Sequence, residues 1–354
     1  MPVRLPLIDA LKALASQLIV LHHLAIYGPM SDAVRPWAGP LVDALADWGR
    51  LAVQPFLVIA GYLAARSLAP GGVPRVAGPM SLVARRWVRL AGPYLAALSV
   101  ALLTAAIGRA LTRHETVPAV PTLPQVLANA AMLQDWLGHE ALSAGVWYVS
   151  IDLQLYALLV GLLWLGARSG RRAAAPALVL ALGAASLFFF NRDPHWDSAG
   201  PYFFGSYALG ALAAWAGPGR HGRLALAAIA LLGLAALVVE PRIRIAVALA
   251  TALLLAVGLP RGWGAHRLDR PVVGALGRIS YSVFLIHYPV CVLFEAAAAR
   301  WFPTSPLPAA AGLLLAWAAS NVAGALLYRS VEAPLTAALA KRRGARPAQS
   351  PSIA

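Results

Sequence analysis

The chain has 354 residues, of which 60% are hydrophobic and only 12% are charged. A soluble domain carries roughly 25% charged residues because its surface must face water, so this composition excludes an ordinary soluble protein. The single cysteine, Cys291, excludes an intrachain disulfide and argues against a thiolate metal centre. We therefore expect no bound metal.

A formal net charge of +15 is also typical of nucleic-acid-binding proteins, since basic patches bind phosphates. Here the arginines form short clusters between apolar runs, not a stripe with interleaved aromatic residues. This is the distribution that the positive-inside rule predicts for the cytoplasmic loops of a membrane protein. We therefore expect membrane lipids, and no nucleic acid, among the partners of this chain.

A helix needs about 20 mostly apolar residues to cross the hydrocarbon core of a bilayer, and the sequence contains ten such runs. They are 8–28, 46–68, 87–110, 147–167, 173–190, 200–217, 223–239, 242–259, 277–299 and 308–331. They predict an all-α fold, a polytopic transmembrane bundle of about ten helices.

The longest outer loop follows the third run, and its apolar residues recur at helical spacing. These residues are Leu123, Val126, Leu127, Ala130, Leu133 and Leu137. The pattern predicts an amphipathic helix that lies on the outer membrane face or dips into it.

Charge gives the sidedness. If the N-terminus is cytoplasmic and the runs alternate, most of the 29 basic residues fall on the cytoplasmic side, and both termini are cytoplasmic. We divide the chain into a transmembrane domain, 1–335, and a basic tail, 336–354, which we expect to be disordered. Abundant Ala, Gly and Arg with only two lysines, Lys12 and Lys341, is typical of a GC-rich bacterial genome. We therefore expect a multi-pass protein of the bacterial inner membrane.

The first run carries two ionisable residues on one face. Lys12 and His23 are eleven residues apart, which is about three helical turns, so both point the same way and lie about 16 Å apart along the axis. His22 is rotated away by roughly 80°. Ionisable groups within membrane helices usually face a cavity or a partner. The alternative is a lysine that reaches the interface beside a structural histidine.

The third run opens with Arg86 and Arg89, three residues apart and hence on one helix face. Two guanidinium groups at a cytoplasmic helix mouth suit phosphate oxygens, because each presents a planar fork of donors. The alternative is ordinary anchoring by positive charge at the cytoplasmic interface.

Two further runs are unusually polar. The fourth contains Asp152 and Gln154, and Asp152 could orient a histidine or hold an incoming hydroxyl group; the alternative is a polar, aromatic helix start at the interface. The ninth contains Ser280, Tyr281 and His287. His287 could instead satisfy a backbone carbonyl freed by the proline that follows it within two residues.

Taken together, these segments resemble the membrane-bound acyltransferase-3 family. The stretches that carry the resemblance occur in order at 7–15 running on to His23, 52–63, 86–94, 147–156 and 276–290, and the end at 328–334 is also similar. The family pattern has a basic residue and a histidine separated by ten positions in the first helix, and Arg-x-x-Arg opening the third.

The resemblance implies an O-acyltransferase that moves an acyl group, usually acetyl, from cytoplasmic acyl-coenzyme A to a hydroxyl of an extracytoplasmic or lipid-linked glycan. By resemblance, His23 is the catalytic histidine, and Lys12, Arg86 and Arg89 hold coenzyme A phosphates.

We also assign Asp152 and Tyr281 to the catalytic site. Tyr281, Ser280 or Gln154 are candidates to stabilise an oxyanion, and His22 or His287 are candidates to assist.

The sequence departs from the family pattern at three positions. Lys12 stands where the family usually has Arg, Asp152 where Glu is common, and Ala60 where Ser is favoured. Lys keeps the charge but loses bidentate geometry, so donor binding is expected to differ. None of these changes removes the histidine.

Two other functions compete with this interpretation. A secondary transporter would also place histidines and acids in the membrane, although we find no inverted repeat. A structural subunit of polysaccharide assembly would not need Lys12 or His23. Because the chain carries no soluble domain, a separate extracytoplasmic partner protein is also conceivable.

Overall fold

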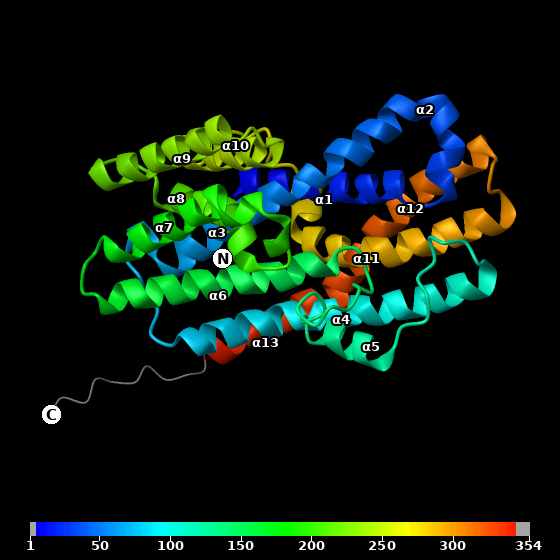
Figure 1. Cartoon of the computed structure of the whole chain (residues 1–354), viewed down its shortest axis with the longest axis horizontal. Helices are drawn as coiled ribbons and strands as arrows, with labels where there is room; N and C mark the ends of the chain where they lie inside the picture. The colour runs from blue at the N-terminus through cyan, green and yellow to red at the C-terminus, as the bar shows by residue number, and fades with distance from the viewer. Residues whose placement is uncertain (1–4, 345–354) are drawn as a thin grey trace.

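The computed structural model describes residues 5–344. In this range the chain is helical throughout and contains no strand (Figure 1). The α-helices are α1 (Pro6–Ile26), α2 (Pro29–Trp48), α3 (Val53–Leu68), α4 (Pro79–Leu111), α5 (Leu123–Ala130), α6 (Val146–Arg168), α7 (Ala174–Phe188), α8 (Gly200–Trp215), α9 (Arg220–Val239), α10 (Ile243–Gly258), α11 (Pro271–Trp301), α12 (Pro306–Leu327) and α13 (Ala333–Gly344). A π-helical turn, Tyr328–Glu332, joins α12 to α13.

The all-α class is confirmed, and each of the ten predicted runs corresponds to one helix, namely α1, α3, α4 and α6 to α12. Among the described residues, eight segments are long and apolar enough to cross a membrane. Helices α3, α7, α8 and α10 have only 15 or 16 residues each, and α3 and α7 reach a spanning length only together with the helical segments that adjoin them. The prediction of about ten spans therefore includes two helices, α8 and α10, that are shorter than a usual span.

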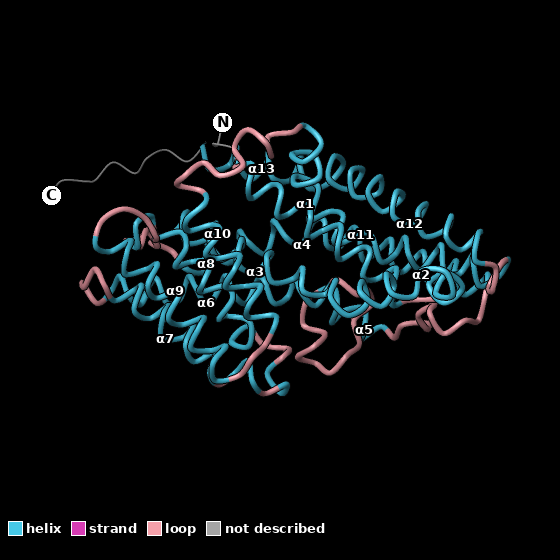
Figure 2. The backbone as a smooth tube through the Cα atoms, turned by 90° about the horizontal axis from the view of Figure 1, so that it is seen from above, coloured by secondary structure: helices cyan, strands magenta, loops and turns pink. Residues whose placement is uncertain are grey.

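The helices form two groups that lie side by side (Figures 1 and 2). One group holds α3 and α6 to α10, and the other holds α1, α2, α11 and α12, with α4 packed along α11. The groups meet where α4 contacts α6 and where α3 contacts α1. The functional residues of the sequence analysis come mostly from the helices at this junction.

Three segments differ from the expectation. Helix α2 covers 29–48, a stretch that was assigned mostly to an outer loop; it contains Pro36 and Pro40 and breaks at Ala38, so its apolar pattern is interrupted. The tail is helical to Gly344 in α13, so the expected disorder over 336–344 is wrong, and 345–354 lie outside the described residues.

The amphipathic helix of the outer loop exists as α5, but it is shorter than predicted. It carries Leu123 and Leu127 on its exposed face and ends at Ala130, and the positive φ of Met132 breaks the helical path. Buried Asn129 fixes the loop, because its side chain bonds the carbonyls of Gln125 and Glu140.

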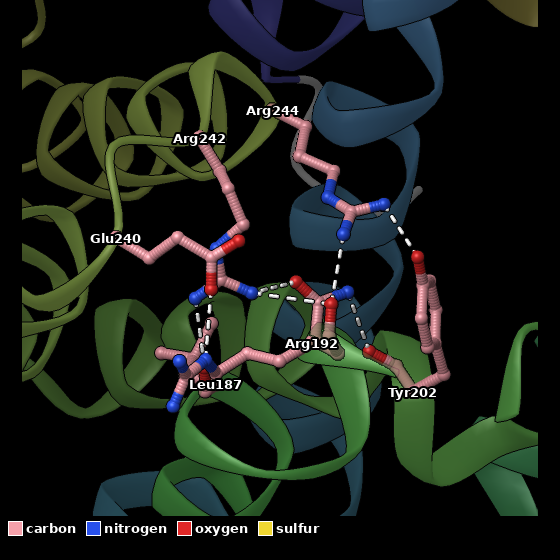
Figure 3. A network of polar contacts seen from close by, with 7 residues as sticks. Leu187, Arg192, Tyr202, Glu240, Arg242 and Arg244 are labelled. Carbon is pink, nitrogen blue, oxygen red and sulfur yellow. Dashed lines mark hydrogen bonds and ion pairs between the residues drawn. The ribbon is translucent and has the colours of Figure 1, made fainter. Parts of the chain in front are cut away.

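A cluster of arginines lies at the end of α7 (Figure 3). Arg242 donates to the carbonyl of Leu187 and to Asn191, and Arg244 donates to the Asn191 carbonyl and to the Tyr202 hydroxyl. Cationic side chains that bond the last carbonyls of a helix stabilise its C-terminus. These arginines are therefore part of the architecture and form no anion site.

Helices α3 and α8 approach so closely that glycine is required on both. A Cβ atom at Gly61 would lie 2.0 Å from the carbonyl oxygen of Tyr207, and one at Gly210 would lie 1.9 Å from that of Val58. Both neighbours are backbone atoms and cannot rotate away. Small residues at such positions allow membrane helices to pack backbone to backbone.

We expect Gly210→Ala to lower the thermal stability of the detergent-solubilised protein by several degrees, since overpacking costs about 1–3 kcal/mol or more. The melting temperature is measured by the loss of the monodisperse peak on size-exclusion chromatography after heating. Gly161→Ala on α6 is the matched control, because a Cβ there meets no atom within 4 Å. Equal melting temperatures for the two variants would contradict the backbone contact.

Candidate active site

A cavity of about 480 Å³ opens at the junction of the two helix groups. It is lined by residues of α1, α3, α4, α6, α11 and α13 and of the π-helical turn that precedes α13. Six of the residues singled out from the sequence line it: Lys12, Arg86, Arg89, Asp152, Ser280 and Tyr281. The helical spacing of Arg86 and Arg89 indeed places both on one face of α4, toward the same cavity.

The cavity is cationic. Its lining contains five basic residues and two carboxylates, with Arg85 and Arg278 adding to the cations named from the sequence. Arg89 and Arg278 are exposed, whereas Lys12 and Arg85 are half-buried. Water-poor walls focus such a field, so the cavity attracts a polyanionic ligand.

One of the five cations forms an ion pair within the cavity wall. The Arg86 guanidinium donates to Asp152 Oδ2 from Nη2 at 2.6 Å and from Nε at 3.1 Å, and the Asp152 side chain is only 6% exposed. The guanidinium also lies 5.3 Å from the ring centre of Tyr156. Asp152 thus holds Arg86 in the wall and is bonded to no histidine, so its expected role of orienting a histidine is not what the geometry provides.

Glu332 is a cavity residue to which the sequence analysis gave no role. It comes from the π-helical turn, accepts a 2.7 Å hydrogen bond from the Ser282 hydroxyl and interacts electrostatically with Lys12 and Arg89. Single π-turns are frequent at functional sites. The sequence could have indicated Glu332, because it lies in the stretch 328–334 that also resembles the family.

Aromatic rings close one part of the cavity. Phe56, Tyr148 and Phe284 all line it, with the Tyr148 and Phe284 ring centres 5.2 Å apart and those of Phe56 and Phe284 6.1 Å apart. Phe284 also lies 6.1 Å from the ring of His287. The Phe284 ring therefore separates the cavity from His287.

His23 does not line this cavity but forms a pair with His287. The two rings are nearly parallel, and His23 Nδ1 lies 2.6 Å from His287 Nε2. His287 is fully buried, and its Nδ1 lies 3.1 Å from the carbonyl oxygen of Val283.

The pair has a defined direction. A carbonyl only accepts, so His287 Nδ1 carries the proton and, in the neutral ring, Nε2 is the acceptor. His23 Nδ1 must then donate to it, which leaves the lone pair of His23 on Nε2. In other catalytic sites a carboxylate accepts this hydrogen bond and so selects the histidine tautomer that can act as a base. His287 is placed to select the same tautomer of His23.

The remaining candidates have other roles. His22 bonds the Leu45 carbonyl of α2 and packs against Gly49, and Gln154 accepts from the backbone N–H of Gly200 at the start of α8. The hydroxyls of Ser280 and Tyr281 donate to the carbonyls of Gly277 and Leu90. His22 and Gln154 thus bond neighbouring elements and do not line the cavity, whereas Ser280 and Tyr281 do.

The fold and the site define a multi-pass membrane protein with a cationic cavity and, beyond Phe284, a histidine pair in which His287 is buried and His23 is half-buried. A model of the acyltransferase 3 family, described as an acyltransferase domain, matches residues 5–324, and the chain belongs to that family. No curated protein and no solved structure matches the chain. The protein is a membrane acyltransferase, and the transporter alternative loses its basis.

The Arg86–Asp152 pair yields a test of stability. Removing one partner of a buried ion pair leaves an uncompensated charge and costs about 3–5 kcal/mol, whereas removing both costs less. We expect Asp152→Asn to lower the melting temperature more than the double variant Arg86→Gln/Asp152→Asn does. Asp43→Asn is the control, since the Arg35–Asp43 pair is exposed and contributes little. A double variant that is the least stable of all would contradict the pairing.

Proposed function

We propose that the protein transfers an acyl group, acetyl in the first instance, from cytoplasmic acyl-coenzyme A to a hydroxyl of an extracytoplasmic or lipid-linked glycan. The observation that carries the proposal is the combination, in a chain of this family, of a cationic cavity and an oriented histidine pair that share one helix, α1.

The donor's phosphates fit the cationic residues. Lys12, Arg85, Arg89 and Arg278 remain for phosphate oxygens, while Arg86 keeps Asp152 and contributes to the field of the site. The pantetheine arm would run along α1 over the distance of about 16 Å from Lys12 toward His23. Phe284 lies on this route, so its ring has to turn aside or let the thioester pass beside it.

His23 acts as a general base in this mechanism. Its Nε2 takes the proton of the acceptor hydroxyl while the oxygen attacks the thioester carbonyl carbon, because an alcohol is a poor nucleophile until its proton is being removed. The tetrahedral intermediate then breaks its carbon–sulfur bond, and the departing thiolate takes the proton from His23 Nε2. Throughout, His287 accepts from His23 Nδ1–H and holds the ring. A transient acyl-imidazole on His23 is the alternative path.

The first prediction of this proposal concerns His23. In protein reconstituted in nanodiscs with labelled acetyl-coenzyme A, we expect His23→Gln to bind the donor but to release coenzyme A at least about 100-fold more slowly. His22→Gln is the matched control, because His22 is adjacent in sequence yet faces α2. Wild-type turnover in His23→Gln, or equal losses in both variants, would refute the assignment.

The second prediction concerns His287 as a positioning residue. We expect His287→Leu to lower kcat by about 100-fold with little change in the KM for the donor, because His23 then loses its Nδ1 acceptor. His287→Gln should recover part of the rate, since its amide oxygen can accept the same hydrogen bond. If Leu and Gln reduce kcat equally while both variants stay folded, the tautomer role is wrong.

The third prediction concerns the phosphates. Arg89→Gln and Lys12→Gln should each raise the KM for acetyl-coenzyme A about 10-fold and weaken its dependence on salt, because an ionic contact is lost. With acetyl-3′-dephospho-coenzyme A, a cation that binds the 3′-phosphate should show a smaller effect. Arg113→Gln, an exposed cation outside the cavity lining, is the control. Unchanged donor KM values in both cavity variants would remove these residues from the donor site.

A further inference from the structure

A second cavity lies at the opposite end of α1 from Lys12. It has a volume of about 530 Å³ and forms where α1 passes into α2 and where the chain leaves α4. Its polar lining includes Tyr27, Asp32, Arg35, His114, Glu115 and Thr116. We refer to this site as the polar cleft.

The polar cleft is connected to the histidine pair through Tyr27. The ring centre of Tyr27 lies 5.5 Å from that of His23 and 5.4 Å from that of Tyr288. Tyr27 follows His23 by one helical turn, and its backbone N–H donates to the His23 carbonyl. On the other side, the Phe284 ring lies between His287 and the cationic cavity, so one aromatic ring separates the pair from each of the two cavities.

The floor of the polar cleft is rigid. Gly28 has φ +89°, and a Cβ atom there would lie 2.3 Å from Glu295 Oε2, so only glycine makes this turn. The backbone N–H of Met30 donates to the same carboxylate, and the Ser31 hydroxyl donates to the Gly28 carbonyl. Glu295 is only 1% exposed, and its Oε1 has no hydrogen-bond partner in the described part of the chain. A buried carboxylate at this depth is costly and usually faces a partner. Here the partner of Glu295 is the backbone of this turn.

The segment that follows α4 forms the other side of the polar cleft, and it is also ordered. His114 Nδ1 lies 3.0 Å from the Thr116 hydroxyl oxygen and accepts from the Thr116 backbone N–H. Glu115, between these two residues, is exposed. The turn at Gly28 and the turn at 114–116 therefore both present side chains from backbone that internal hydrogen bonds already fix.

The charge of the polar cleft selects its ligand. Asp32 and Glu115 carry negative charge, and the one basic residue of the lining at neutral pH, Arg35, forms an ion pair with Asp43. Carboxylates repel phosphates and uronates but accept hydrogen bonds from hydroxyl groups, and a tyrosine ring provides an apolar face beside them. This is the reverse of the cationic cavity, which attracts anions.

We propose that the polar cleft binds the acceptor, and that the sugar unit which receives the acyl group is an uncharged polyhydroxylated ring. This inference rests on the proposed function, since it assigns the second substrate of the same reaction. Asp32 and Glu115 accept hydrogen bonds from sugar hydroxyls, and Tyr27 supports the ring next to His23. The cleft discriminates against acidic sugars through its carboxylates.

The test uses a matched pair of probes, octyl glucoside and octyl glucuronide, below their micellar concentrations. Protein in nanodiscs receives labelled acetyl-coenzyme A, and acetylated glycoside and free coenzyme A are measured in parallel by mass spectrometry. We expect His23-dependent acetylation of the glucoside and at least 10-fold slower acetylation of the glucuronide. Asp32→Asn and Glu115→Gln should each raise the KM for the glucoside about 10-fold and leave the donor KM and the water-driven release of coenzyme A unchanged. They should also reduce the difference between the acetylation rates of the glucoside and the glucuronide.

Asp47→Asn is the control, because Asp47 is an exposed acid on the same helix α2 that does not line the cleft. If coenzyme A is released in a His23-dependent way but the glucoside is not acetylated, or the cleft variants behave like Asp47→Asn, the acceptor assignment is wrong while the acyltransferase mechanism stands. If the glucuronide is the better substrate, the charge argument is wrong. If the wild type releases no coenzyme A, the proposed function fails first, and this assignment with it.

Discussion

A charged arginine inside an apolar helix bundle needs a carboxylate partner or water. In this protein the Arg86–Asp152 pair meets that requirement. Arg86 comes from α4 and Asp152 from α6, which belong to different sides of the helix junction. The pair therefore connects the two groups at the wall of the cationic cavity. With Asp152 bound, Arg86 stays within the wall, and the remaining cations face the open space. The position of the cavity follows from this contact.

The two cavities are lined mainly by charged groups of opposite sign. Guanidinium and ammonium groups line the cavity at one end of α1, and the carboxylates of Asp32 and Glu115 line the cavity at the other end, so our proposals assign an anionic donor to the first and an uncharged acceptor to the second. The histidine pair lies between them and needs no carboxylate, because the Val283 carbonyl fixes His287 and His287 fixes His23. A neutral chain of hydrogen bonds suits a site buried in an apolar bundle, where an additional charge would be expensive.

Much of this could be predicted from the sequence, because helical periodicity determines which residues of one helix share a face. Spacing put Arg86 and Arg89 on one helix face, the family resemblance joined Lys12 to them, and all three line one cavity. Contacts between helices could not be predicted in this way. Nothing in the spacing indicates that Asp152 meets Arg86 or that His287 meets His23, since these partners are 66 and 264 residues apart. Helix α2 was missed because prolines and charges interrupt its apolar pattern, and α13 because a short basic end resembles a disordered tail.

The shortness of α10 has a consequence for the lipid around the protein. A helix of 16 residues is about 24 Å long, which is less than the roughly 30 Å hydrocarbon thickness of a typical bilayer. As a membrane span, α10 can match the bilayer only if the lipid beside it is compressed or if a flanking cation extends toward the headgroups. Arg261, just beyond its C-terminal end, is exposed, whereas Arg242 at its start is bonded to Leu187 and Asn191. Helices α11 and α12, at 31 and 22 residues, impose no such mismatch on the other side. With α10 as a span, the lipid would have to be thinner along α10 than along α11 and α12, and the acyl-chain length of the surrounding membrane would affect the stability of the protein.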